Sequence, residues 1–466
     1  MNHHNMARCQ LSCLFLTLCL PASAKAAETR PTAPVSLRRW AEQDYMFGNW
    51  GGLRSDLSKR GVDFEFLYAG SMPDSLAGGL KPGAIYQGAL MMMLDLDSQK
   101  MLGYSGGTFH ASGLWLHGQK PFSDRYVGDL NKVNLLDYPN AARLWELSYQ
   151  QKLFDDQLAF KFGQLSIDRD FIVPEYYGSF GQSTLLNQTF FFPSLAFDVF
   201  DIPGLPPRHH GLATTPLAAP GLLMRWRPVK SAYFQAGVYG GNPDQSYSGT
   251  DFNLSSPAGA LAYFELGYRL NQDTNSPGLE GSYKLGGYYH TGSFVDVYDG
   301  VTWAFNAQAG IPQPAGRDHH GNYGLYLLAE QQLYRENDKA DPARQGLVAF
   351  FRLSGAPADR NLAQFGIDGG LVYTGLFSSR NWDTLALGAS YLGISDAIRR
   401  AQQDANLLAP GSFVVSDHET ALELSYKVQA TAWWTIQPSL QYVLHPGGSA
   451  AIPNATVFIL QTTFRF

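Results

Sequence analysis

The last nine residues of the chain, 458–466, alternate between two chemical characters and constrain the fold more than any other segment. Successive side chains of a strand point to opposite faces. One face would hold Phe458, Leu460, Thr462, Phe464 and Phe466, and the other Gln461, Thr463 and Arg465. A final strand with one apolar face, one polar face and a terminal phenylalanine is typical of the closing strand of an outer-membrane β-barrel. A half-buried strand of a soluble sheet can show the same alternation. We interpret Phe464 and Phe466 as an assembly signal for the barrel.

Residues 1–26 have the pattern of a secretory signal peptide. Arg8 supplies positive charge, Leu11 to Leu20 form a short apolar run, and small residues around Ala24 and Ala26 fit a cleavage site. The run is too short to span a bilayer. All three cysteines lie inside this segment. The mature chain is therefore expected to have no disulfide and no cysteine metal site.

Composition favours an exported chain without membrane helices. Of the 466 residues, 14% are aromatic, 16% are charged and 48 are glycine. After residue 30, no stretch approaches the roughly 18 to 20 apolar residues of a membrane helix. Without the signal peptide, 32 basic residues face 40 acidic ones, a net charge of −8. This balance does not favour nucleic-acid binding, which needs a basic face.

Alternation over about ten residues at a time distinguishes a membrane barrel from a soluble β-sandwich, whose strands are usually nearer five or six residues. Segments 222–239, 262–270, 347–354 and 419–429 each confine their charged residues to one face. We predict that this face points to a water-filled lumen. The predicted lining residues are Arg225, Arg227, Glu265, Arg269, Lys284, Glu330, Arg352, Glu423 and Lys427.

The chain divides into a signal peptide (1–26), an N-terminal periplasmic segment (27–60) and an outer-membrane β-barrel (61–466). In the N-terminal segment, Leu53 and Leu57 lie one helical turn apart and predict a short amphipathic helix that props or plugs the barrel mouth. At roughly 25 residues per strand and connection, 406 residues suffice for about 16 strands, within two. Short turns alternate with long Gly/Pro/Asn/Asp-rich stretches, as in 298–322 and 394–416. The predicted fold class is thus an all-β transmembrane antiparallel barrel.

Several motifs resemble those of the carbohydrate-selective porins of Gram-negative outer membranes, the OprB-type family. The runs that carry the resemblance are Gly-Asn-Trp-Gly-Gly-Leu-Arg (48–54), Tyr-Lys-Leu-Gly-Gly-Tyr-Tyr (283–289), Gly-Asn-Tyr-Gly-Leu-Tyr (321–326), Glu-Gln-Gln-Leu-Tyr (330–334), Gly-Leu-Val-Ala-Phe-Phe-Arg (346–352), Gly-Leu-Val-Tyr-Thr-Gly (370–375) and Pro-Ser-Leu-Gln-Tyr-Val-Leu-His-Pro-Gly-Gly (438–448). They occur in order over almost the whole mature chain. The resemblance implies a 16-stranded outer-membrane porin through which glucose and other small sugars or polyols diffuse passively, and it implies no cofactor.

One segment, 171–207, departs from the family pattern, which leaves the substrate range open. It is long and aromatic for an external loop, so we predict that it folds into the lumen and narrows it. The predicted constriction residues are Asp168, Arg169, Asp170, Glu175, Tyr177, Asp198 and Asp201. Opposite charges across a narrow pore would favour a polyhydroxyl solute over an apolar one.

Other functions find weaker support. Gly103 to Gly107 match the G-x-S-x-G pattern of a hydrolase elbow, but a strand follows where that elbow needs a helix, so we predict a turn and no enzyme. The pairs His209-His210 and His319-His320 lack carboxylates at ligand spacing, so we predict no metal. A general or other-solute channel and a barrel adhesin remain the alternatives. The expected partners are small sugars, outer-membrane lipid and lipopolysaccharide, and the assembly machinery, with the chain a monomer or a homotrimer.

Overall fold

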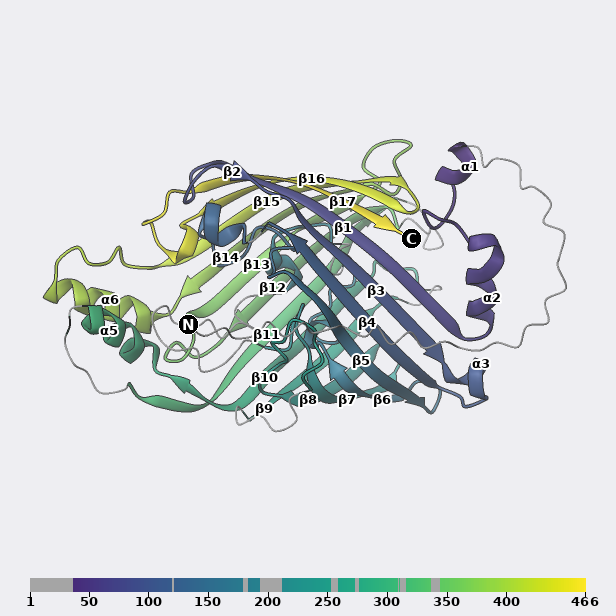
Figure 1. Cartoon of the computed structure of the whole chain (residues 1–466), viewed down its shortest axis with the longest axis horizontal. Coiled ribbons are helices and arrows are strands. Elements are labelled where there is room, and N and C mark those ends of the chain that lie inside the picture. Colours follow the sequence, from purple (N-terminus) through teal and green to yellow (C-terminus); the bar gives the residue numbers. More distant parts are fainter. Residues whose placement is uncertain are drawn as a thin grey trace, which may run out of the picture.

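A computed structural model of the chain forms a β-barrel with short helices at both ends (Figure 1). The structure describes residues 37–119, 121–178, 183–192, 212–252, 259–272, 276–308, 310, 316–336 and 344–466. Residues 1–36, which include the predicted signal peptide, lie outside this set. The strands are β1 (Val62–Ala77), β2 (Gly83–Ala84), β3 (Gln87–Asp97), β4 (Gly107–Gly118), β5 (Ala141–Leu153), β6 (Leu158–Leu165), β7 (Ala219–Val229), β8 (Ala232–Gly240), β9 (Ala260–Leu270), β10 (Gly281–Val295), β11 (Asp318–Arg335), β12 (Gly346–Gly355), β13 (Ala363–Thr374), β14 (Thr384–Ile394), β15 (His418–Thr431), β16 (Trp434–Leu444) and β17 (Ala455–Arg465). The helices are α1 (Leu37–Ala41), α2 (Leu53–Lys59), α3 (Ser98–Leu102), α4 (Gln188–Phe191), α5 (Val297–Gln308) and α6 (Asp396–Leu408).

Antiparallel pairing runs around the whole wall and closes on itself. Consecutive long strands pair with each other, and β1 pairs with β17 from Leu67 opposite Arg465 to Ala77 opposite Thr456. The two-residue β2 only adds to the outer end of β1, at Asp74 and Ser75. The wall is therefore a closed barrel of sixteen antiparallel strands, which confirms the predicted fold class. Closure gives each long strand a partner strand on both sides.

The two ends of the barrel differ in their connections. One end has tight turns, such as those at 154–157, 230–231 and 432–433, and also holds the start of β1 and the end of β17. The other end carries longer connections, two of which contain α5 and α6 (Figure 1). Short turns mark the periplasmic end of bacterial outer-membrane barrels, so α5 and α6 lie at the outer end. The stretches 298–322 and 394–416 are thus partly helical rather than simple loops.

The two faces of the wall have the predicted alternation. On β15, the Leu422 and Leu424 side chains are 42% and 49% exposed, whereas Glu423 between them is 1% exposed. The outward residues have no protein neighbours to cover them and would face lipid, while the inward ones are covered by protein inside the barrel. Within the described ranges, no helix has the length and apolar character needed to cross a membrane.

The N-terminal segment docks where the barrel closes. The Trp40 ring packs 4.4 Å from the Trp433 ring, and the Met46 backbone N–H donates to the Arg465 carbonyl over 2.9 Å. Gly51 and Gly52 have φ angles of +67° and +104°, which a residue with a Cβ adopts only with strain, and they turn the chain into α2. The helix predicted around Leu53 and Leu57 is present as α2, and β1 begins at Val62. The domain division itself stays a prediction.

Candidate functional site: the barrel lumen

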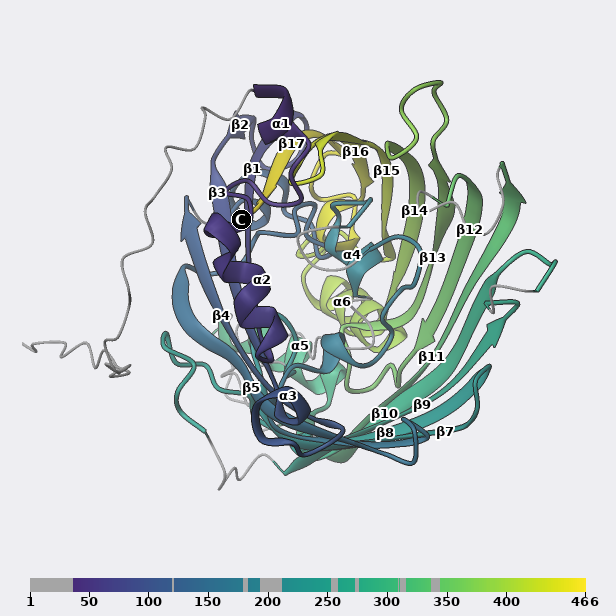
Figure 2. The ribbon, with the colours of Figure 1, turned by 90° about the vertical axis from the view of Figure 1, so that its right-hand side faces the viewer.

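Two segments that leave the outer end of the wall fold back into the barrel. The short lumen segment comprises residues 121–140, between β4 and β5, and the long lumen segment comprises the described residues 166–178, 183–192 and 212–218, between β6 and β7. Figure 2 looks along the barrel and shows α4, part of the long lumen segment, inside the ring of strands. Both segments carry large apolar side chains, such as Phe122, Leu136, Phe171 and Phe190, which are 0% exposed. Burying such side chains favours a packed position inside the barrel over an exposed external loop.

Glutamates on the inward face of the wall hold these segments by their backbone. Segments without a strand partner need other acceptors for their N–H groups, and a carboxylate can accept two at once. The acceptors are Glu419 for Leu130 and Asn131 (both 2.7 Å), Glu265 for Ile172 (2.9 Å), Glu330 for Glu175 and Tyr176 (both 2.9 Å), and Glu423 for Leu186 (2.7 Å) and Asn187 (2.9 Å). Glu265, Glu330 and Glu423, predicted to line the pore, face inward but are at most 1% exposed.

Arg352 binds α4 as a hydrogen-bond donor to backbone carbonyls, whereas the glutamates accept from backbone N–H groups. Its guanidinium donates to the backbone carbonyls of Thr189 and Phe190 and to Asp368 on the neighbouring strand, the last over 3.0 Å. The side chain is 0% exposed. Arg352 therefore satisfies the C-terminal carbonyls of a short helix, which have no partner within the helix itself. Like the buried glutamates, it faces the lumen beneath a layer of protein.

Charged pairs between the long lumen segment and the wall stay in part accessible. Glu175 lies 3.1 Å from Arg269 and 3.5 Å from the Lys284 ammonium. Asp170 lies 3.7 Å from Arg225. The Arg269 and Arg225 side chains are 37% and 28% exposed.

The environment of Glu175 favours its ionised form. Partial burial acts to raise the pKa of the Glu175 carboxyl, but Lys284, a hydrogen bond from Gln272 and the charge of Arg269 act in the other direction and leave that pKa below its ordinary value. At neutral pH the group is a carboxylate beside two cations. The arrangement offers a sugar hydroxyl both hydrogen-bond donors and acceptors.

The remaining predicted residues lie in different surroundings. Asp168 is buried and ties the two ends of the long lumen segment together by accepting from the Ser166 hydroxyl (2.6 Å) and the Thr215 N–H (2.9 Å), and burial raises the pKa of its carboxyl. Tyr177 is buried with its ring 4.2 Å from the Phe350 ring. Arg169 lies 3.4 Å from Glu146 on β5.

Two further lining candidates lie near the periplasmic end. Arg227 pairs with Asp156 in the turn between β5 and β6. Lys427 is half-buried and lines a cavity of about 110 Å³ beside Trp433. Asp198 and Asp201 lie outside the described residues. The roles of all these residues in transport stay predictions.

The sequence interpretation missed the short lumen segment. Asp137 binds the backbone N–H groups of Phe122 (2.8 Å) and Ser123 (2.9 Å), and Val133 and Leu136 are 0% exposed. The available signal was the run of apolar residues among polar ones at 133–136, which an external loop would have no means to bury. The alternation within a single strand does not indicate which wall residues contact the short lumen segment.

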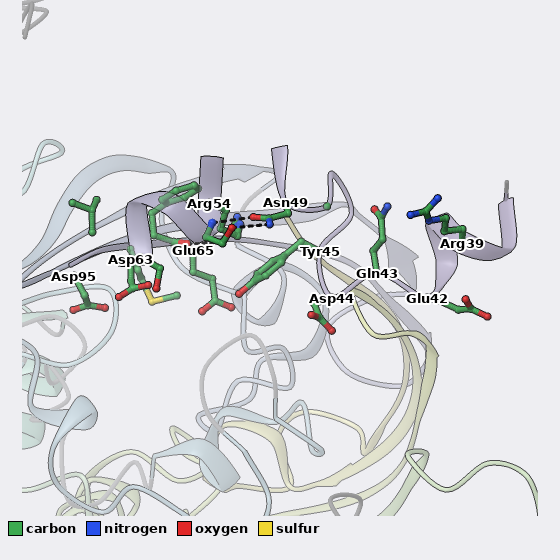
Figure 3. Close-up of a pocket in the computed structure, with 16 residues that line it drawn as sticks. Arg39, Glu42, Gln43, Asp44, Tyr45, Asn49, Arg54, Asp63, Glu65 and Asp95 are labelled. Carbon is green, nitrogen blue, oxygen red and sulfur yellow. Dashed lines mark hydrogen bonds between the residues drawn. The ribbon is translucent and has the colours of Figure 1, made fainter. Parts of the chain in front are cut away.

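A second space lies at the periplasmic mouth, between the N-terminal segment and the first strands. This cavity of about 810 Å³ is lined by acidic side chains from several elements, together with Tyr45 and Arg54. Figure 3 shows Asp44, Asp63, Glu65 and Asp95 pointing in the same direction, away from α2. Arg54 is engaged elsewhere, because it donates to the carbonyls of Phe64 and Phe466 over 2.7 Å each.

One group of potential metal ligands occurs in the described part of the chain. It consists of Asp417, His418 and His445, at the outer end of β15 and β16, and the sequence interpretation did not predict it. His319 instead contacts Asp296 over 2.8 Å, and the pair His209-His210 lies outside the described residues.

Comparison with known proteins agrees with this architecture. The profile of the family described as carbohydrate-selective porin, OprB family, matches residues 81–466. Porin B of Pseudomonas aeruginosa is 27% identical, with 97% of each chain covered, and the putative porin QuiX of Acinetobacter baylyi is 22% identical, with 92% of this chain and 94% of that protein covered. The high-pH structure of Pseudomonas putida OprB superposes with a TM-score of 0.77 at 26% identity, covering 91% of this chain and 99% of that one.

The family match confirms the resemblance seen in the sequence motifs and the expected location in the outer membrane. Its members are channels rather than enzymes, and the closed barrel with a polar interior fits a passive path for sugars. The profile covers most of the chain, and the whole-chain relatives carry the same description of a porin. This chain therefore belongs to the OprB family of carbohydrate-selective porins.

Proposed function

We propose that glucose and other small sugars or polyols cross this porin by passing a constriction between the long lumen segment and the barrel wall. The groups that a sugar meets there are Arg225, Arg269 and Glu175. The observation that carries the proposal is the pairing of Glu175 with Arg269 and Lys284 across the gap between segment and wall. Both signs of charge occur at this place, which suits a neutral polyol better than a strongly charged solute.

Passage needs weak binding at several places rather than one tight site. A sugar that enters the lumen exchanges hydrogen bonds with water for hydrogen bonds with these side chains, so the net free energy per contact is small. A guanidinium offers several N–H donors in a fixed plane, and the carboxylate accepts from neighbouring hydroxyls. A tight site would retain the sugar and slow its flux.

The test is single-channel conductance in planar bilayers with glucose added in steps. Wild-type current should fall as glucose occupies the constriction, and Arg269→Gln should weaken this block several-fold. Arg380→Gln is the matched control, because Arg380 pairs with Asp383 in a connection at the periplasmic end and lies away from the lumen segment. Absence of any glucose effect on the wild-type current would contradict the proposal.

The other expected partners form part of the same proposal. The exposed apolar residues of the wall would contact outer-membrane lipid and lipopolysaccharide, and Phe464 and Phe466 would present the last strand to the assembly machinery. We expect the protein to be a monomer or a homotrimer in the membrane. The mass of the detergent-solubilised protein, measured by light scattering, distinguishes the two states.

A further inference from the structure

Three side chains at the outer rim of the barrel converge on one point. Asp417 and His418 stand at the start of β15, and His445 follows the end of β16, the strand paired with it. The Asp417 carboxylate lies 3.0 Å from His445 Nδ1 and 3.2 Å from His418 Nδ1. The two imidazole rings are 4.6 Å apart. Residues 27 positions apart in the sequence therefore present one oxygen and two nitrogen ligands to the same place.

The spacing of these atoms suits a small divalent ion. One ligand atom from each of the three residues can be chosen so that all lie within 4.8 Å of one another. Around a tetrahedral zinc ion with bonds of about 2.0 to 2.2 Å, ligand atoms lie roughly 3.3 to 3.5 Å apart. Small side-chain rotations can therefore bring the three atoms to bonding distance.

The partners of the Asp417 carboxylate distinguish this group from the other histidine–carboxylate cluster at the outer end, where arginines pair with the carboxylates. There, His319 lies beside Asp296 and Asp359, and arginines complete the ion pairs: Arg317 lies 3.5 Å from Asp296, and Arg360 lies 2.8 Å from Asp359. In the part of the chain that the structure describes, the ion pairs found for Asp417 are with His418 and His445 alone. A bound dication would supply the positive charge that arginine supplies at the other cluster.

The surroundings hold the three residues in place. The His418 ring stacks on Tyr391 at 5.0 Å, and the Asp417 backbone is fixed by hydrogen bonds with Ile394 and Gly448. His445 has a φ of +51°, an uncommon conformation for a residue with a Cβ, and its backbone N–H donates to the Asn454 side-chain oxygen. Strained residues held by their neighbours often position ligands. The side chains are 27%, 47% and 29% exposed for His418, Asp417 and His445, so an ion can enter from the medium.

We propose that Asp417, His418 and His445 form a zinc-binding site at the outer rim of the barrel. Two imidazole nitrogens and one carboxylate oxygen would bind the ion, and water would complete its coordination. This donor set favours zinc and similar transition metals over calcium and magnesium, which prefer oxygen ligands. The site is separate from the sugar constriction and does not depend on it.

The test is isothermal titration of zinc chloride into the untagged, folded, full-length mature protein in detergent. Wild type should bind one zinc ion per chain, unaffected by excess magnesium. The double variant His418→Gln/His445→Gln should weaken zinc binding by more than about tenfold. Replacing a residue that only hydrogen-bonds to a metal ligand already lowers metal affinity by about tenfold or more, and this variant removes two ligands. The matched control is His320→Gln, another outer-rim histidine, which contacts the Ser293 hydroxyl at 3.2 Å.

Two measurements keep the test decisive. Heat-modifiable migration in gels confirms that each variant is folded, and cobalt substitution gives an absorption spectrum that reports nitrogen and oxygen coordination directly. Equal zinc affinity in wild type and in the folded double variant would overturn the proposal. So would wild-type protein that binds no zinc.

Discussion

At the scale of single residues, two groups of inward-facing charges in this barrel differ in their surroundings. The Arg225 and Arg269 side chains stay partly exposed, whereas Glu330, Glu423 and Arg352 bind the backbone of a segment that covers them. Alternation along a strand identifies the face of each residue correctly, as it does at Leu424 and Glu423. It contains no information about what lies over that face. The separation of accessible from buried charges therefore could not be predicted from the strands alone.

Replacing a wall glutamate should loosen the lumen segment without unfolding the barrel. In Glu330→Gln, the amide group brings N–H donors towards the N–H groups of Glu175 and Tyr176, which lose part of their acceptor. We expect the folded state to lose about 1 to 3 kcal/mol. The measurement is the temperature at which the heat-modifiable gel form disappears. Glu336→Gln, the same change at an exposed residue just beyond β11, should leave that temperature nearly unchanged.

Acid should weaken the contact between Glu175 and the wall. The pKa of Glu175 in the folded protein lies below its ordinary value of 4.5, so the ionised form favours the folded arrangement. This contribution is present above pH 4.5 and is lost as the pH falls through the lower pKa of the folded state. We expect current noise to rise below that pH in wild type. Glu175→Gln should be noisy at every pH, and an identical acid response in that variant would contradict the assignment.

At the scale of elements, the N-terminal segment and the last strand form one unit. Arg54 lies with its guanidinium 3.8 Å from the Tyr45 ring centre and donates to the carbonyls of Phe64 and Phe466, so it joins α2, β1 and the chain end. The run 48–54 that carries part of the family resemblance thus holds the place where the barrel closes. The sequence predicted a helix here, but its partner, 412 residues away, could not be read from a local pattern.

Deleting Phe466 should lower the folded fraction in the outer membrane. We expect its ring to make two separable contributions: presenting an aromatic end to the assembly machinery, and packing 5.3 Å from Phe47. Phe47→Ala removes the second contribution and keeps the first. The measurement is the heat-modifiable fraction in purified outer membranes. Phe466→Ala is the second comparison, because it keeps the backbone groups that bind Arg54 and Phe66. Large losses in the deletion and in Phe466→Ala, with a small one in Phe47→Ala, would support the assembly role, whereas equal losses in Phe466→Ala and Phe47→Ala would indicate that the packing contact dominates.

The limits of prediction at this scale follow from the range of the interactions. Strand alternation depends on neighbouring residues, so strands such as those in 222–239, 262–270 and 419–429 were predictable from the sequence. The number of strands followed only from the chain length, within two, and from the family resemblance. Helix α6, in contrast, was interpreted as part of a loop because turn-forming residues surround it, and its packing against α5, with Val297 and Ile398 in one cluster, is a tertiary contact. The lumen segments depend on wall residues far away in sequence, such as Glu423 for Leu186.

At the scale of the whole molecule, the barrel wall is a single layer of strands, so neighbouring side chains face lipid on one side and the interior on the other. The same substitution should therefore have different effects on stability at outward and inward positions. Leu424→Arg places a guanidinium in hydrocarbon near the middle of β15 and should destabilise the barrel by about 2 to 4 kcal/mol. Gln429→Arg, on the inward face of the same strand beside the small polar cavity, should be mild. Ser425 is an unsuitable control, because it is buried and accepts a hydrogen bond from Gln437. Urea unfolding in lipid vesicles measures both variants.

The distribution of charge between the two ends gives the last prediction. Acidic side chains gather in the cavity at the periplasmic mouth, where Asp44 and Asp63 join Glu65 and Asp95 (Figure 3). Arg39 and Arg54 also line this cavity, and Glu65 pairs with Arg465, but acidic side chains outnumber basic ones. A concave mouth with an excess of one sign raises the local concentration of counterions, and salt screens the effect over about 10 Å at 0.1 M. The pore should therefore favour potassium over chloride in a potassium chloride gradient. Asp44→Asn/Asp63→Asn should reduce this preference, most strongly at low salt, whereas Asp396→Asn on α6 at the outer end should not. Reversal potentials measure the preference, and an unchanged value in the double variant would show that the mouth does not set ion selectivity.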